Sequence, residues 1–140
     1  MKKVILILII LSLILVAGCA PYKQEGSQVE IDGITAPNTI EITSSGFNPP
    51  ELTINAGETV TFINKDTEPH WPASAMHPTH KVYPGSDIAK CGTSEASNIF
   101  DACKDLGPEE TYSFTFNEVG EWNYHDHKNP SLFGKVIVQV

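Results

Sequence analysis

The stretch Glu58-Thr59-Val60-Thr61-Phe62-Ile63-Asn64 decides the fold class, because its residues alternate in character with a period of two. Val60 and Phe62 fall on one face and Thr61 on the other, which is typical of a half-buried β-strand. The same period recurs in other runs of the chain, at residues 40–43, 52–54, 112–116 and 136–140. Turn signals rich in Gly and Pro separate these runs. The sequence therefore predicts an all-β fold, an antiparallel sandwich or barrel with little helix.

One segment, residues 71–105, does not share the alternation and is predicted to be a long inserted loop. Loops of this length in a compact domain are usually functional or held by a covalent link. Cys91 and Cys103 both lie in it, twelve positions apart, and we expect them to form a disulfide. The alternative is that one of them supplies a thiolate to a metal.

The N-terminal residues are typical of an exported protein. Met1-Lys2-Lys3 is basic, and residues 4–16 form an apolar run broken only by Ser12. This run is too short to span a bilayer comfortably and has the length of a signal-peptide core. The following Val16-Ala17-Gly18-Cys19 resembles the lipobox of prokaryotic lipoproteins, in which the cysteine is lipidated and becomes the new N-terminus.

We therefore expect a signal peptide over residues 1–18, a lipid-attached tether over 19–38 and a folded domain over 39–140. The tether is polar and contains Gly, Ser and Pro. The expected location is the extracytoplasmic face of the cell membrane, with the protein held there by a lipid on Cys19. A plain N-terminal membrane anchor is the alternative, and it places the domain on the same side.

The charge of the chain argues against a nucleic-acid partner. The formal net charge is -8, and all nine basic residues are lysines. Phosphate binding depends on clustered Lys and especially Arg, which this chain lacks. An acidic surface is better suited to cations or to a basic protein partner.

Two groups of motifs resemble a cupredoxin domain. The first runs from Gly46-Phe47-Asn48-Pro49 to Pro69-His70, and the second from Gly107-Pro108-Glu109-Glu110 through Gly120-Glu121-Trp122-Asn123-Tyr124-His125 to Gly134-Lys135-Val136. Together they cover nearly all of residues 39–140 apart from the insertion. Cupredoxins are Greek-key β-sandwiches that hold one copper ion, and most transfer electrons. The resemblance implies the same fold, with copper as the cofactor and a redox or copper-exchange protein as the partner.

The sequence departs from the family at the metal ligands. A blue-copper site needs two imidazoles and a thiolate, often with a weak axial Met. Alignment of the C-terminal motif places Asp126 at the family's cysteine, Asn129 at its second histidine and Leu132 at its methionine. Only His70 matches a ligand of the family, so no ordinary blue centre is expected.

All five histidines lie in two clusters, at positions 70, 77 and 80 and at positions 125 and 127. Imidazole is the commonest protein ligand for copper and zinc. The residues leave two arrangements open. One is a site at the family position, with His70, Asp126 and a loop histidine; the other is a histidine-rich site formed by His77, His80, His125 and His127. Asp126 could instead orient an imidazole.

Three functions compete on this evidence. The leading hypothesis is a membrane-anchored copper-binding protein for electron transfer or copper handling, with zinc as a competing metal. The second is a metal-free interaction module that acts through the insertion. The third is a small metalloenzyme, which ranks last because no nucleophile or acid/base pair stands out and fold alone does not establish activity.

Overall fold

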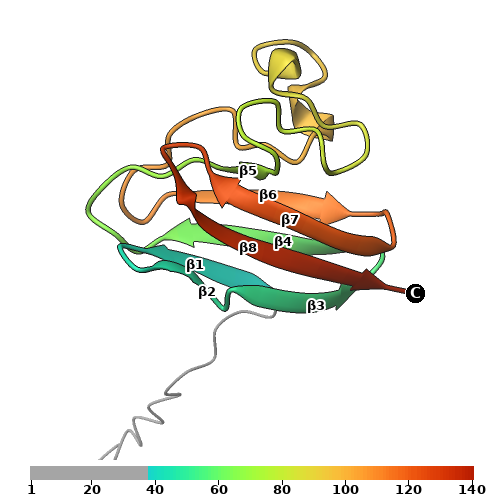
Figure 1. Ribbon diagram of the computed structural model, residues 1–140, viewed down its shortest axis with the longest axis horizontal. Coiled ribbons are helices and arrows are strands. Elements are labelled where there is room, and N and C mark those ends of the chain that lie inside the picture. The colour runs from blue at the N-terminus through green and yellow to red at the C-terminus, as the bar shows by residue number, and fades with distance from the viewer. Residues whose placement is uncertain (1–37) are drawn as a thin grey trace, which may run out of the picture. The chain divides into compact units, whose positions relative to one another are not determined.

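The computed structural model describes residues 38–140, which form two four-stranded β-sheets (Figure 1). The first sheet has the strand order β2-β1-β4-β6. Its strands are β1 (Thr39–Thr43), β2 (Gly46–Asn48), β4 (Glu58–Asn64) and β6 (Thr111–Phe116). The second sheet has the order β3-β8-β7-β5. Its strands are β3 (Glu51–Asn55), β5 (Pro72–Ser74), β7 (Gly120–Asp126) and β8 (Asn129–Gln139).

Both sheets are mixed, so the expectation of purely antiparallel pairing is wrong. Strand β1 runs parallel to β4, with Ile40 beside Phe62, and β3 runs parallel to β8, with Leu52 beside Val136. The remaining pairs are antiparallel. A period of two identifies a strand but says nothing about the direction of its neighbour, and strand direction depends on where the connections cross. The predicted all-β sandwich itself is confirmed.

The core lies between the inner faces of the sheets. It is built from the apolar members of each alternating run, as the burial of Val60 and Phe62 in β4 illustrates. The aromatic rings of Phe47, Phe62 and Tyr124 meet edge to face, with centroids 4.7–6.3 Å apart. Such contacts add stability beyond the burial of apolar area.

The insertion packs onto the sandwich through its own apolar residues. Tyr83 and Phe100 are buried in the same core cluster as the strands. The Tyr83 hydroxyl accepts hydrogen bonds from the backbone N–H groups of Asn117 and Glu118, at 3.0 and 3.3 Å. The insertion begins with β5, which the sequence did not indicate because three residues are too few to show alternation. It also contains two 3-10 turns, η1 (Ile88–Lys90) and η2 (Ala96–Asn98).

The expected disulfide between Cys91 and Cys103 is present, with the two Cα atoms 5.3 Å apart. It closes a loop between two cysteines 12 positions apart and limits how far these parts of the insertion can separate. Both cysteines are therefore unavailable as thiolate ligands.

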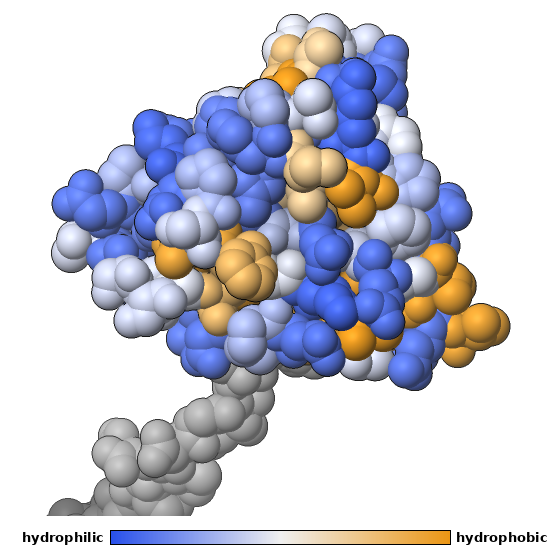
Figure 2. Space-filling view, viewed as in Figure 1, coloured by the Kyte–Doolittle hydropathy of each residue, from blue (hydrophilic) through white to orange (hydrophobic). Residues whose placement is uncertain are grey.

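The surface is largely hydrophilic, with apolar side chains in small patches on the face that Figure 2 shows. Among residues 38–140, no helix is long and apolar enough to cross a membrane. The expected signal peptide, Cys19 and the tether up to residue 37 lie outside the described residues.

Candidate metal centre

Four histidines from separate parts of the chain converge at one edge of the second sheet. They are brought together by the loop after β5, by β7 and by the turn that follows β7. One ring nitrogen from each lies within 4.8 Å of one from every other. We call this group the four-histidine cluster: His77, His80, His125 and His127.

Local backbone geometry explains how the loop and the strand place these rings. The His80 N–H donates to the Met76 carbonyl at 2.9 Å, which closes a tight turn carrying both loop histidines. In β7, the pairing register shifts between His125 and Asp126. The chain then turns, and the His127 N–H donates to the Trp71 carbonyl at 2.8 Å. His125 and His127 thus face the loop histidines, whereas Asp126 does not join the cluster.

The rings contact one another closely. The centroids of His77 and His127 are 4.9 Å apart, as are those of His80 and His125. His80 Nε2 lies 3.0 Å from His127 Nδ1. His80 and His125 are buried, His127 is half-buried and His77 is exposed, so the cluster has one side open to solvent.

His125 is the most unusual member, because both of its ring nitrogens are buried without a hydrogen-bond partner among the described residues. Burial, reinforced by the nearby rings of His80, His77 and His127, lowers the pKa of His125 to about 4. Its imidazole is therefore neutral at physiological pH. A neutral imidazole with unsatisfied nitrogens is the form that binds a metal ion.

The Nδ1 edge of the His80 ring, opposite the nitrogen that faces His127, is held by a carboxylate. Its Nδ1 lies 2.6 Å from Asp101 Oδ2, and both side chains are fully buried. Asp101 Oδ1 also accepts hydrogen bonds from Trp71 Nε1 at 2.6 Å and from the Cys103 N–H at 2.8 Å. Burial alone would raise the pKa of Asp101, but these hydrogen bonds outweigh it and the net pKa is lowered.

Trp71 also contacts the cluster directly through its ring. Its ring centroid is 4.5 Å from that of His127, which limits the orientations open to this imidazole. Burial, and then the neighbouring His80 and His77, lowers the pKa of His127. His127, like His125, is thus favoured in its neutral form.

The residues at the family's ligand position form a separate group. His70 Nδ1 lies 2.8 Å from Asp126 Oδ2, and His70 Nε2 lies 3.2 Å from Asp66 Oδ2. Both ring nitrogens of His70 therefore face carboxylates. The other Asp126 oxygen accepts the Trp71 N–H at 2.8 Å. This arrangement engages His70 and Asp126 in internal hydrogen bonds and does not bring them into the four-histidine cluster.

The other two positions aligned with family ligands are also occupied by local interactions. Asn129 Oδ1 accepts a hydrogen bond from the Ser131 hydroxyl at 2.5 Å. Leu132 packs against the apolar core.

A largely apolar pocket of about 420 Å³ opens beside the cluster. Its lining includes His77 and His125 together with Met76 and Phe133. Met76 is 69% exposed and Phe133 is 73% exposed, so the accessible side of the cluster has an apolar rim.

Sequence reasoning did not identify Asp101 or a polar role for Trp71. Asp101 lies in the irregular insertion, and no motif distinguishes it from the other acidic residues there. Its proximity in sequence to Cys103 was the one available signal, because a disulfide fixes the backbone on which the carboxylate stands.

Comparison with known proteins places these features in a family context. A family model described as copper-binding proteins of the plastocyanin/azurin family matches residues 34–139. Amicyanin from Paracoccus denitrificans is 30% identical over 100 residues, which cover 71% of this chain and 63% of amicyanin. The chain thus spans less than two thirds of that relative. Plastocyanin A'/A'' from Nicotiana tabacum is 31% identical over 94 residues, covering 66% of this chain and 86% of the plastocyanin.

Solved structures show the same architecture. A purple cupredoxin from Nitrosopumilus maritimus aligns with a TM-score of 0.55 at 24% identity, over 72% of this chain and 98% of that one, and it supports the fold alone. An oxidized mutant of amicyanin aligns with a TM-score of 0.56 at 25% identity, over 77% of this chain and 87% of that one.

Proposed function

Since the chain belongs to the plastocyanin/azurin family of copper-binding proteins, we propose that it binds one copper ion in the four-histidine cluster. The membership confirms the cupredoxin resemblance found in the sequence. The proposal depends mainly on the environment of His125. Its two buried ring nitrogens have no hydrogen-bond partner among the described residues, and three other imidazoles surround it. A buried imidazole without hydrogen bonds is costly unless a ligand compensates it.

The spacing of the nitrogens suits a single metal ion. Bonds of about 2.0–2.1 Å between a metal and imidazole nitrogens place two ligands of one ion about 2.8–4.2 Å apart. The 3.0 Å between His80 Nε2 and His127 Nδ1 matches two adjacent ligands. All four ligand nitrogens lie within 4.8 Å of one another, so only small side-chain movements are needed for them to bind one ion.

The donor set differs from that of a blue-copper site. Four imidazole nitrogens without a thiolate favour tetragonal Cu(II), for which zinc is the natural competitor. Copper in this position would supply one-electron chemistry, while the protein buries His80 and His125, half-buries His127 and leaves His77 exposed. We propose that the protein exchanges electrons or copper with a protein partner at this exposed side.

The proposed location is the extracytoplasmic face of the cell membrane. A lipid on Cys19, joined to the domain by the polar segment before residue 39, would keep the copper site close to the membrane surface. Anchoring would raise the local concentration of the protein near membrane-bound partners.

A second candidate function is a metal-free interaction module. It is favoured by the loss of three of the family's four ligand positions and by the carboxylates that occupy both ring nitrogens of His70. The two candidates differ in one measurable property, which is whether the purified protein retains a metal.

Titration of the metal-free protein with Cu(II) tests the proposal. We expect one copper per chain, nitrogen hyperfine structure in the EPR spectrum, and a pale solution without the intense visible band of a copper–thiolate bond. The variants His77→Ala and His125→Ala should bind copper much more weakly. His70→Gln is the matched control and should bind like the wild type, because His70 lies outside the cluster.

Four results would contradict the proposal. An intense blue form would require a cysteine ligand. A loss of binding in His70→Gln with normal binding in His77→Ala would place copper at the family position. Failure to retain either copper or zinc would favour the metal-free module, and retention of zinc alone would reject copper as the metal.

A further inference from the structure

The buried carboxylate of Asp101 is directed at one ligand of the proposed copper site. Its Oδ2 lies 2.6 Å from His80 Nδ1, and Asp101 and His80 are 2% and 0% exposed. A carboxylate only accepts hydrogen bonds, so the proton of the neutral His80 ring must be on Nδ1. His80 Nε2 is then the acceptor of the 3.0 Å hydrogen bond with His127 Nδ1, and its lone pair is the one that a metal ion would take.

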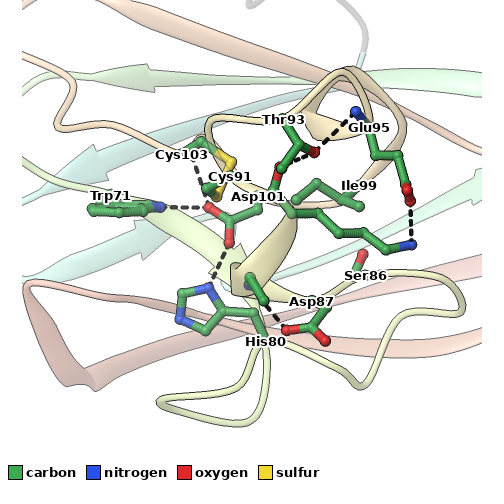
Figure 3. Close-up of a disulfide and its surroundings, with 12 residues drawn as sticks. Trp71, His80, Ser86, Asp87, Cys91, Thr93, Glu95, Ile99, Asp101 and Cys103 are labelled. Carbon is green, nitrogen blue, oxygen red and sulfur yellow. Dashed lines mark hydrogen bonds and ion pairs between the residues drawn. A yellow bond between two sulfur atoms is a disulfide. The ribbon is translucent and has the colours of Figure 1, made fainter.

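The carboxylate cannot easily rotate away from His80. Its second oxygen, Oδ1, accepts hydrogen bonds from Trp71 Nε1 at 2.6 Å and from the Cys103 N–H at 2.8 Å. Figure 3 shows these donors arranged around Asp101, with the disulfide of Cys103 next to them. One indole and one backbone group thus fix the plane in which the other oxygen meets His80.

The second ring nitrogen of His80 points toward the cluster. His80 Nε2 lies 3.0 Å from His127 Nδ1, on the opposite side of the ring from Asp101. The His80 ring therefore bridges the buried carboxylate and the position where the other imidazoles converge.

We infer that Asp101 is a positioning residue, which holds His80 in the Nδ1–H tautomer with Nε2 directed at the copper ion. This inference rests on the proposed copper site. A carboxylate behind a metal-bound histidine fixes the tautomer and orientation of the ring and makes its other nitrogen a stronger donor. None of these roles requires Asp101 to touch the metal.

The variant Asp101→Asn separates this role from simple packing. An Asn side chain has nearly the same shape, and its carbonyl oxygen can still accept from Trp71 and Cys103. Its NH₂ group would then face His80 Nδ1 and donate to it, so the ring proton would move to Nε2. That proton blocks the nitrogen proposed to bind copper.

The first experiment determines the His80 tautomer in the metal-free wild-type protein by two-dimensional ¹H–¹⁵N NMR of the imidazole rings. We expect the Nδ1–H form in the wild type and the Nε2–H form in Asp101→Asn. An Nε2–H tautomer in the wild type would overturn the inference. This measurement needs no metal, so its result does not depend on whether the proposed function is correct.

The second experiment compares Cu(II) affinities by competition with a chelator. We expect Asp101→Asn to bind copper about 10–100-fold more weakly than the wild type. The control is Asp105→Asn, which removes the same charge from an exposed residue of the insertion paired with Lys128 at 3.0 Å, and it should bind like the wild type. Unchanged affinity in a folded Asp101→Asn would overturn the inference while leaving the copper site intact. Absence of copper binding in the wild type would instead reject the proposed function.

Discussion

Burial and the neighbouring imidazoles together set the pKa of His125. Its side chain is 4% exposed, and three other imidazoles surround it. Both conditions disfavour a positive charge, so the pKa falls from its usual 6.5 to about 4. The metal-free protein therefore holds this ring neutral, in the state required for coordination.

This pKa predicts an acid-sensitive stability for the metal-free protein. Between about pH 6.5 and 4, the unfolded chain binds a proton at His125 that the folded chain does not, so the free energy of unfolding must fall as the pH falls. We expect a loss of about 2–3 kcal/mol across this window, measured by urea unfolding. The variant His125→Gln should show a smaller loss. An equal loss in the variant would assign the effect to other groups, such as His127.

Gly134 is required by a close approach between strands. A Cβ atom at this position would lie 2.8 Å from the Pro50 carbonyl oxygen and would also clash with the Tyr124 ring. We expect Gly134→Ala to lower the free energy of unfolding by about 1–3 kcal/mol, because the buried ring cannot move aside. Gly107→Ala is the control, since its Cβ would meet only the Glu110 side chain, at 3.8 Å. Equal stability of the two variants would contradict the prediction.

The insertion is the element that distinguishes this chain most clearly from a plain sandwich. It supplies two of the four imidazoles, the carboxylate of Asp101 and the disulfide. It is not a free loop, because Tyr83 and Phe100 join the core and β5 pairs with β7. The geometry of the candidate site therefore depends on how rigidly this one element is held.

Removal of the disulfide tests that dependence. The double variant Cys91→Ser/Cys103→Ser should lose about 3 kcal/mol of stability, because the unfolded chain gains the freedom of an open loop. We also expect weaker copper binding, since Cys103 positions the backbone N–H that holds Asp101. Thermal unfolding and copper competition measure the two effects. Lower stability with unchanged copper affinity would show that core packing alone positions the site.

At the scale of the whole molecule, the proposed export and lipid attachment would place the proposed copper site at the membrane surface. The variant Cys19→Ser removes the proposed lipid, and we expect the protein to leave the membrane fraction when cells are fractionated. Membrane retention of the unprocessed variant through residues 4–16 would support the plain-anchor alternative. We expect the proposed copper binding to be unchanged, because the four proposed ligands are histidines of the folded domain.

The sequence by itself determined the strands with clear alternation, the family and the disulfide. Strand alternation is a local pattern, so the sequence alone predicts that residues such as Val60 and Phe62 are buried. The pairing of Cys91 with Cys103 could be predicted because the expected compartment favours disulfides and the folded domain has only these two cysteines. The histidines were recognisable as candidate ligands for the same reason, since imidazole chemistry does not depend on the fold.

Only the tertiary structure decided which histidines meet. The sequence left His70 with Asp126 and the other four histidines as competing arrangements, because the distance between a loop and a strand depends on long-range packing. The structure separates the two groups through the register shift after His125 and the docking of the insertion. Asp101 was likewise invisible in the sequence, since its partners Trp71 and His80 are 30 and 21 positions away and meet it only in the folded chain.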